Sequence, residues 1–381
     1  MHSTSNLYRQ GTGLRWSMGT TITIFLLLAL TLNPTAASAT TLKPSFNGPE
    51  AYSYLQSQMV FGNRIPNTTA HQNCVNYIAA TLKDLGLTVS YQNFTGSSGE
   101  GLNIPFVNII GVLNANNTTQ RRIFLTAHYD TRPFSDHDID GRPTSPDYSH
   151  PVPGANDGAS GVAVLLELAR VMQQYNRTRD IYFIFFDGED YGTNEGSMLY
   201  GSKYYASHMS EAEVSSTDYL VLLDMIGDKE LTIYREGESD MGLMDSIFSK
   251  AEDLGISQFI NTTEYNIIDD HIPFKDRHMK VVDLIDFDYP NKTLNYWHTP
   301  ADTIDKVSIG SLEATGKVVE GFLDDSIVSH TNNGGGNNNN TTPPPPKPHK
   351  DPKFIPGFEG PVLVATVAIV ILLRYRRSIR A

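Results

Sequence analysis

Cysteine is almost absent from this sequence: Cys74 is the only one, so no disulfide can form within the chain. It lies in NCVNYIAATLKDLG, where apolar residues recur at helical spacing, and we expect a buried structural thiol on that helix. The sequence also has neither a G-x-x-x-x-G-K-[ST] phosphate-binding loop nor a G-x-S-x-G nucleophile elbow. These absences remove the usual support for a nucleotide-dependent enzyme and for a serine hydrolase.

Basic side chains are scarce in the central part of the chain. The whole sequence has 29 Lys and Arg against 42 Asp and Glu, and residues 40–330 hold 40 of the acids but only 20 of the bases. A domain with this excess of negative charge repels the phosphate backbone of nucleic acids. We therefore expect no nucleic-acid partner.

The two ends of the sequence differ from the central part. Residues 1–39 run from a polar stretch with two arginines through an apolar run to Ala-Ser-Ala, the layout of a signal peptide, with an uncleaved short anchor as the alternative. Residues 331–353 are rich in Asn, Gly, Thr and Pro, which predicts a linker. Residues 354–381 carry a short apolar run followed by four arginines, which predicts a C-terminal membrane anchor with the domain at 40–330 outside the cell.

This C-terminal segment begins its apolar part with Pro356-Gly357-Phe358 and ends in the arginine cluster. In that layout it resembles archaeal PGF-type sorting signals. The resemblance implies either a retained anchor or removal of the segment during lipid attachment.

Nine N-x-Thr triplets also favour export, because this triplet is the acceptor for N-glycosylation. We therefore expect an extracellular glycoprotein. The triplets begin at Asn67, Asn93, Asn116, Asn117, Asn176, Asn261, Asn291, Asn339 and Asn340.

Short β-rich apolar runs alternate with amphipathic helical patterns through the central part of the chain. This alternation predicts a single α/β domain at residues 40–330, with a mostly parallel central β-sheet flanked by helices. The expected strands are 121–128, 180–187, 218–225 and 279–287, and the expected helices include 159–173, 197–208, 241–253 and 308–325.

Polar side chains follow the expected strands where each strand ends. Because ligands bind at the carboxyl ends of strands in open α/β sheets, these side chains predict one common site. Taken singly, each could be a helix cap, a loop acceptor or a hydrogen-bonded core histidine. Together, two imidazoles and three carboxylates make a ligand set suited to zinc. The candidate ligands are His128, Asp157, Asp190, Asp224 and His298, and Asp130 is placed to hold the other ring nitrogen of His128.

Seven motifs between about residues 128 and 299 give a family resemblance. They are, in order, HYD, GANDGASGVAVLLELAR, FFDGEDYG, LYGSKY, VLLDMIG, DDHIPF and YWHT. Their order and spacing resemble zinc peptidase family M28 and, within it, the glutaminyl cyclases. The resemblance implies that Asp157, Asp190 and His298 hold a catalytic zinc and that Glu189 is the general acid and base.

The resemblance leaves the number of metals open. His128 and Asp224 would complete a second site in the two-metal aminopeptidases, whereas the cyclases keep similar residues and use one zinc. We expect one zinc, with two as the alternative.

Two motifs bear on the reaction, which in both branches begins at a peptide or protein N-terminus. The DDHIPF segment resembles that of cyclases, whose first acid, here Asp269, hydrogen-bonds the reacting groups. With this residue added, the catalytic candidates that the resemblance implies are Glu189, Asp224 and Asp269. Trp297 immediately precedes His298, and a large ring there could narrow a substrate pocket and exclude water. It could also be a core tryptophan that only packs.

One position departs from the cyclase pattern: Met198 lies where cyclases often carry a second Trp. On balance we expect a zinc-dependent glutaminyl-peptide cyclotransferase, which converts N-terminal Gln to pyroglutamate and releases ammonia. An M28 aminopeptidase is the alternative, and a non-catalytic surface binding protein is the remote alternative.

Residues 136–147 open with the D-x-D-x-D-G pattern of a calcium-binding loop, with Asp147 at the twelfth position. Prolines at 133, 143 and 146 prevent the flanking helices of an EF-hand, and the twelfth residue is Asp where a bidentate Glu is usual. We therefore favour an ordinary acidic loop beside the active-site entrance over a calcium site.

Overall fold

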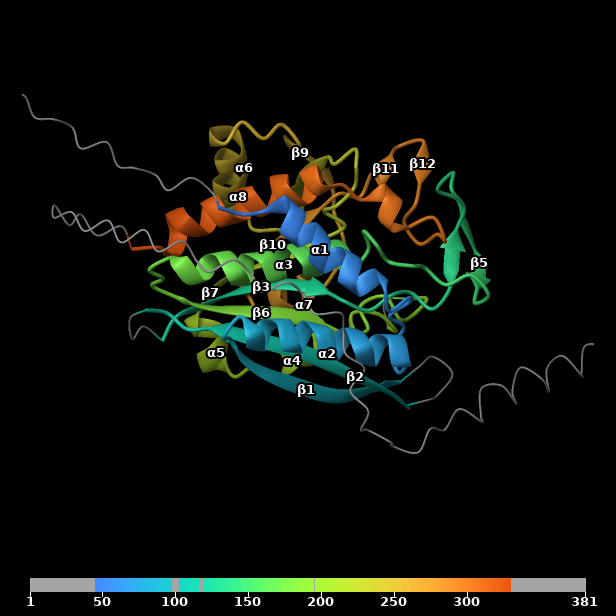
Figure 1. Ribbon diagram of the computed structural model, residues 1–381, viewed down its shortest axis with the longest axis horizontal. Coiled ribbons are helices and arrows are strands. Elements are labelled where there is room, and N and C mark those ends of the chain that lie inside the picture. The colour runs from blue at the N-terminus through green and yellow to red at the C-terminus, as the bar shows by residue number, and fades with distance from the viewer. Residues whose placement is uncertain (1–44, 98–102, 117–119, 195, 330–381) are drawn as a thin grey trace, which may run out of the picture. The chain divides into compact units, whose positions relative to one another are not determined.

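A six-stranded sheet forms the centre of the part of the chain that the computed structural model describes, residues 45–97, 103–116, 120–194 and 196–329 (Figure 1). The strand order is β1-β2-β6-β3-β7-β10, and the last four of these strands are mutually parallel. The parallel strands are β3 (Arg122–His128), β6 (Asp180–Phe186), β7 (Thr217–Asp224) and β10 (Val281–Ile285).

An antiparallel hairpin that the sequence did not predict completes one edge of the sheet. Its strands are β1 (Thr88–Ser97) and β2 (Asn103–Leu113), and β2 also pairs antiparallel with β6. The mostly parallel α/β sheet is confirmed, with antiparallel pairing confined to this edge.

Eight helices and several short strands surround the sheet within the described residues. The helices are α1 (Gly48–Met59), α2 (Thr69–Asp84), α3 (Ala159–Val171), α4 (Tyr200–His208), α5 (Glu211–Ser216), α6 (Met241–Asp253), α7 (Ile272–Lys275) and α8 (Ile309–Ile327). The short strands pair as β4 (Ser135–His137) with β5 (Pro143–Asp147), β8 (Ile233–Glu236) with β9 (Phe259–Tyr265), and β11 (Pro290–Asn291) with β12 (Leu294–Asn295).

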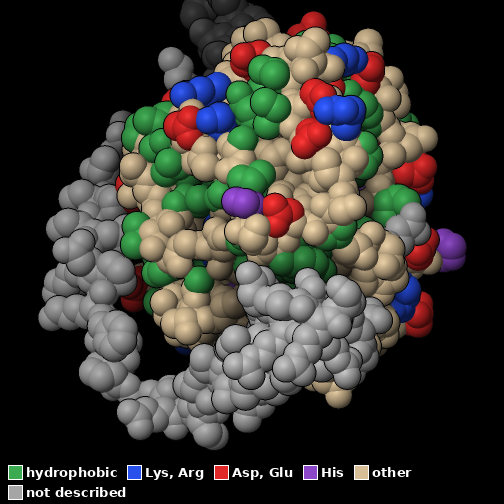
Figure 2. Space-filling model, turned by 90° about the vertical axis from the view of Figure 1, so that its right-hand side faces the viewer, with side chains coloured by type: hydrophobic (Ala, Val, Ile, Leu, Met, Phe, Trp, Pro, Cys, Tyr) green, Lys and Arg blue, Asp and Glu red, His purple; other side chains and the backbone are tan. Residues whose placement is uncertain are grey.

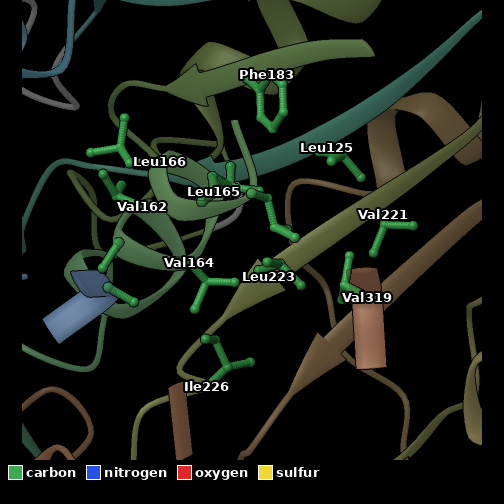
Figure 3. Packing of buried hydrophobic residues seen from close by; sticks show 14 of the residues in the cluster. Leu125, Val162, Val164, Leu165, Leu166, Phe183, Val221, Leu223, Ile226 and Val319 are labelled. Carbon is green, nitrogen blue, oxygen red and sulfur yellow. The ribbon is translucent and has the colours of Figure 1, made fainter. Parts of the chain in front are cut away.

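Side chains alternate between the two faces of the sheet, as the period of a strand requires. Leu125 and Phe183 belong to the larger core, which also contains residues of α1, α2, α3, α6 and α8 (Figure 3). Their neighbours Phe124 and Ile184 belong to a second core with residues of α4 and α7. The parallel strands are therefore buried on both faces, which explains their nearly continuous apolar sequences.

Most helix predictions are confirmed to within about two residues at either end, the usual uncertainty of helix limits. The helix expected at 197–208 is shorter, because Leu199 has the left-handed φ of 58° and the helix begins only at Tyr200. Cys74 is fully buried on α2, as expected. Burial raises the pKa of its thiol to about 12, so the side chain stays neutral.

The predictions for residues 1–39, 331–353 and 354–381 concern segments outside the described residues. No helix in the described ranges is both long and apolar enough to cross a membrane.

Candidate metal centre

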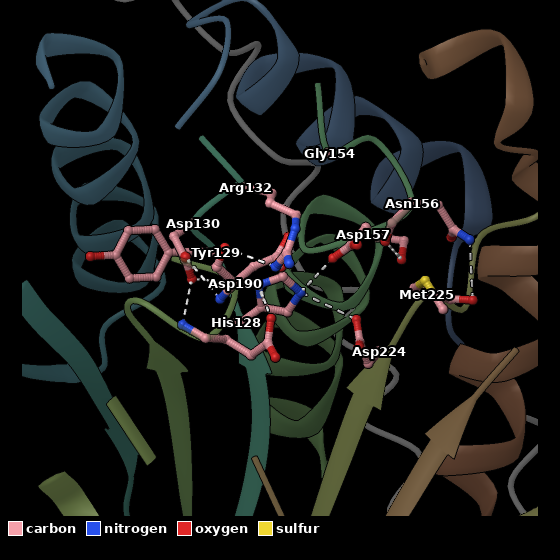
Figure 4. Close-up of polar contacts among 12 residues, drawn as sticks. His128, Tyr129, Asp130, Arg132, Gly154, Asn156, Asp157, Asp190, Asp224 and Met225 are labelled. Atoms are coloured by element: carbon pink, nitrogen blue, oxygen red, sulfur yellow. Dashed lines mark hydrogen bonds and ion pairs between the residues drawn. The ribbon is translucent and has the colours of Figure 1, made fainter. Parts of the chain in front are cut away.

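The polar residues predicted at the strand ends come together at the carboxyl ends of the parallel strands (Figure 4). His128 is the last residue of β3 and Asp224 is the last residue of β7. Glu189 and Asp190 lie in the turn after β6, and Asp157 directly precedes the residue that caps α3. The sheet thus brings together residues that are far apart in the sequence, as the strand-end argument predicts.

Asp157, Asp190 and His298 form one compact group. One ligand atom from each residue lies within 4.8 Å of the others, and all three side chains are buried. The Nε2 atom of His298 lies 3.2 Å from Oδ1 of Asp190. Two carboxylates and one imidazole in this arrangement fit a catalytic zinc, which takes three protein ligands and keeps a position open.

His128 lies at the centre of a second group that shares Asp157 with the first. Its Nε2 atom is 3.0 Å from Oδ1 of Asp157 and 3.3 Å from Oδ1 of Asp224. Neither ring nitrogen of His128 has a hydrogen-bond partner of good geometry, and neither does Oδ1 of Asp224. Buried polar atoms of this kind are normally satisfied, so the donor set also fits a second cation between His128, Asp157 and Asp224.

Asp130 supports the turn that carries Glu189 and Asp190. Its carboxylate accepts the backbone N–H of Glu189 at 3.1 Å and that of Asp190 at 3.3 Å. Its Oδ1 atom is also 3.5 Å from Nδ1 of His128, on the side predicted from the sequence. Asp130 therefore orders two neighbouring parts of the site.

Glu189 is buried beside several other acids. Burial raises the pKa of its carboxyl well above the usual value; the positive charge of His128 opposes the shift, whereas Asp190, Asp269 and Asp270 add to it. Asp269 is also buried, and its Oδ2 atom has no hydrogen-bond partner. A carboxyl group with a raised pKa can hold a proton near neutral pH, which general acid and base catalysis requires.

Backbone geometry explains part of the GANDGASG motif. Gly158 has a φ of +95°, and a Cβ atom at this position would lie 2.9 Å from the carbonyl oxygen of Asp130 and 3.1 Å from Cε1 of His128. A side chain would therefore be strained by its φ and would collide with the site.

Asp302 is a structural neighbour of the site that sequence analysis missed. Its carboxylate accepts the backbone N–H of Asn156 at 2.8 Å and that of Asp157 at 3.1 Å, and it also accepts the Tyr289 hydroxyl at 2.7 Å. It fixes the segment that carries Asp157. In the sequence, its only link to the site is its position four residues after the candidate ligand His298.

Trp297 lies against the candidate ligand that follows it. Its ring centroid is 3.7 Å from that of His298, with an angle of 26° between the planes. It also contacts Phe287 and the ring of His137. The side chain is half-buried and thus reaches both the core and the surface around the site.

The acidic loop at 136–147 lies beside this site. It lines a cleft of about 560 Å³ together with Thr299 and Pro300, which follow His298. Figure 2 shows the side of the molecule on which β5 lies, where a histidine and an acidic side chain lie together near the centre.

The carboxylates of the calcium-loop pattern face different partners. Asp138 and Asp140 pair with Arg142, and Asp147 pairs with His150. Asp136 instead points to His298. The expectation of an ordinary acidic loop stays a prediction, and the contacts of Asp136, Arg132 and His137 with the site were not anticipated.

Comparison with known proteins gives the same family as the motifs. The family description "Peptidase family M28" matches residues 108–323. The curated relatives include aminopeptidase YwaD of Bacillus subtilis, 31% identical over 58% of this chain and 44% of its own length, so the match spans less than half of that protein.

Two solved structures match this protein over nearly the whole of their own chains. A Zn-dependent exopeptidase from Parabacteroides distasonis has a TM-score of 0.66 and 35% identity, over 74% of this chain and 98% of that one. A glutaminyl cyclase from Porphyromonas gingivalis has a TM-score of 0.67 and 33% identity over the same shares.

Proposed function

The chain belongs to peptidase family M28, and on that basis we propose that it is a zinc-dependent glutaminyl-peptide cyclotransferase acting on peptide or protein N-termini. The stacking of Trp297 on His298 is the observation that favours cyclisation over hydrolysis. A large ring against a metal ligand restricts the space for substrate and keeps water away from the reacting atoms. Intramolecular cyclisation gains from both effects, because water would compete with the attacking amine.

In the proposed reaction the α-amine of an N-terminal Gln attacks the carbonyl carbon (Cδ) of its own side-chain amide, and the bond from that carbon to the side-chain nitrogen breaks. A zinc ion held by Asp157, Asp190 and His298 would polarise the γ-carbonyl group. Glu189 accepts the proton of the attacking amine and passes it to the departing nitrogen, which leaves as ammonia. The raised pKa of Glu189 supports this transfer in both directions.

Asp269 and Asp224 are the other proposed catalytic groups. Asp269 has a buried oxygen without a hydrogen-bond partner, and its charge acts on Glu189. We assign it to orienting the amine of the substrate. Trp297 would form the wall against which the Gln side chain lies.

One observation favours the aminopeptidase as a second candidate. His128 and Asp224 have unsatisfied atoms only 3.3 Å apart, beside the Asp157 carboxylate that could bridge two ions. We propose one zinc, and elemental analysis of the purified protein tests it. Two equivalents of tightly held zinc would favour the hydrolase.

A paired assay separates these functions. The purified protein is incubated with a Gln-initiated peptide, with the same peptide acetylated at its N-terminus, and with Leu-p-nitroanilide. We expect ammonia release only from the free Gln peptide, since acetylation removes the attacking amine. Release of nitroaniline without ammonia would identify the aminopeptidase, and neither product would favour a binding protein.

We also propose that the domain is exported as a glycoprotein and attached to the cell surface through the C-terminal segment. The signal-like N-terminus and the arginine cluster support this proposal. Five of the predicted acceptor asparagines within the described residues are exposed, which fits glycosylation: Asn67, Asn93, Asn116, Asn176 and Asn261. Fractionation of cells with antibody detection, before and after glycosidase treatment, tests both parts.

A further inference from the structure

Asp136 lies behind His298, on the side opposite the candidate metal. Nδ1 of His298 is 3.1 Å from Oδ1 of Asp136, and its Nε2 is 3.2 Å from Oδ1 of Asp190. The two ring nitrogens thus face two carboxylates, of which only Asp190 belongs to the compact ligand group. When Nδ1 donates its hydrogen to Asp136, Nε2 keeps the lone pair that binds a metal.

The backbone of His298 also needs support. Its φ of 58° lies in the left-handed region, which costs a residue with a side chain on the order of 1 kcal/mol or more. The backbone N–H of Asp136 donates to the carbonyl oxygen of His298 at 3.2 Å. Asp136 therefore holds this residue through both its main chain and its side chain.

Asp136 is itself fixed in place. Its Oδ2 atom accepts from Nη2 of Arg132 at 2.7 Å, and its Oδ1 atom also lies 3.0 Å from Nδ1 of His137. The positive charge of Arg132 lies against this carboxylate, which makes Asp136 a strong acceptor for the ring N–H of His298.

Arg132 connects Asp136 with the metal group. Its Nη1 atom pairs with Asp190, while Nη2 binds Asp136. The buried guanidinium thus sets the distance between the ligand Asp190 and the carboxylate that holds His298. The side chains of Asp136, His137 and His298 also lie close enough together to hold a metal ion. The charge of Asp136 is, however, already paired with the guanidinium of Arg132.

We propose that Asp136 is a positioning residue for zinc binding, which holds the His298 ring with Nε2 directed at the metal and is itself held by Arg132. This inference rests on the proposed zinc-dependent function. It gives the first acid of the calcium-like pattern a different purpose: this acid orients a ligand of the metal site.

The test measures zinc affinity in the full protein, by competition with a chelating dye, for the wild type, Asp136→Ala and Asp136→Asn. Asp138→Asn is the matched control, because Asp138 lies on the same loop, is half exposed and pairs with Arg142. We expect Asp136→Ala to weaken zinc binding by about 10–100-fold. Asp136→Asn keeps an acceptor oxygen but loses the charge, so we expect a smaller loss, and we expect none for Asp138→Asn.

Two further measurements separate positioning from general stability. The visible spectrum of the Co²⁺-substituted protein should change in the Asp136 variants, because the spectrum reports ligand geometry. The melting temperature of the metal-free protein should fall only slightly in the Asp136 variants, because the proposed role concerns the zinc ligand and not the fold. A purely structural residue would lower this melting temperature and leave zinc affinity and spectrum unchanged.

Unchanged zinc affinity in both Asp136 variants would overturn the inference, as would an equal loss in Asp138→Asn. If Asp136→Ala does not fold, the affinity of Asp136→Asn decides the question alone. A wild type that binds no zinc overturns both this inference and the proposed function. Tight, Asp136-dependent zinc binding without glutamine cyclisation would overturn only the function.

Discussion

At the scale of single residues, Glu189 and the ligand residues should respond differently to substitution. Glu189→Gln keeps the shape of the side chain but removes the proton acceptor, so turnover should fall by about 100-fold or more while zinc stays bound. Asp157→Ala should lower the zinc content itself. Activity assays combined with metal analysis check both results, and normal turnover in Glu189→Gln would show that another group accepts the proton.

The sequence predicted the site residues that end strands, but not those that act through contacts distant in the sequence. His128 and Asp224 end apolar strands, so the strand pattern alone predicted that they would meet. Asp136 and Asp302 act through contacts with His298 and with the backbone of Asp157, across separations of 162 and 145 residues. No local pattern marks such a contact: in the sequence Asp136 reads as the first acid of a calcium-like loop and Asp302 as an ordinary loop residue.

At the scale of elements, the approach of α3 to β7 depends on Gly161. A Cβ atom at this position would lie 2.1 Å from the carbonyl oxygen of Leu223 and 3.0 Å from Cβ of Ala127. Gly161→Ala should therefore push the helix from the sheet, with a loss of about 1–3 kcal/mol in the free energy of unfolding. Because Asp157 lies just before this helix, zinc affinity should fall as well.

A second glycine provides the control for this prediction. Gly310 is in the first turn of α8, and an added Cβ atom would have its nearest neighbour at 3.9 Å. Gly310→Ala should leave stability unchanged or raise it by up to about 1 kcal/mol, because alanine favours the helix. Urea unfolding of both variants measures the difference; equal destabilisation would refute the role of the contact with β7.

The elements themselves were predictable to different degrees. The strands of the parallel core are buried on both faces and read as apolar runs, which made them easy to find. In the β1–β2 hairpin at the edge of the sheet, strand β1 has many exposed residues, including Tyr91, and its sequence TVSYQNFTGS is largely polar rather than an apolar run. Its pairing depends on tertiary contacts with β6, which the sequence does not display.

At the scale of the whole molecule, stability should fall as pH rises from about 6 to 9. Burial raises the pKa of Asp228 to about 6 and that of Asp286 to about 8, and the charge of Asp228 adds to the second shift. In the unfolded chain both groups titrate near pH 4, so the native state binds more protons throughout this range. The stability that these two groups contribute is therefore fully present below about pH 4 and is lost as the pH rises through the folded-state pKa values.

Melting temperatures of the metal-free protein across this pH range measure the effect without a contribution from pH-dependent metal binding. Asp286→Asn removes one of the titrating groups and should flatten the curve. A melting temperature that rises from pH 6 to 9 would contradict the assignment of these raised pKa values.

The order of the ligands along the chain sets the time at which the metal can be acquired. Asp157 and Asp190 are synthesised long before His298, and the chain between Asp190 and His298 includes the sheet strands β7 and β10. A growing or translocating chain therefore lacks a complete zinc site until nearly all of its domain has emerged. If the domain is exported as an unfolded chain, it must take its zinc from the medium outside the cell, and the activity of each molecule would depend on the metal supply of its surroundings.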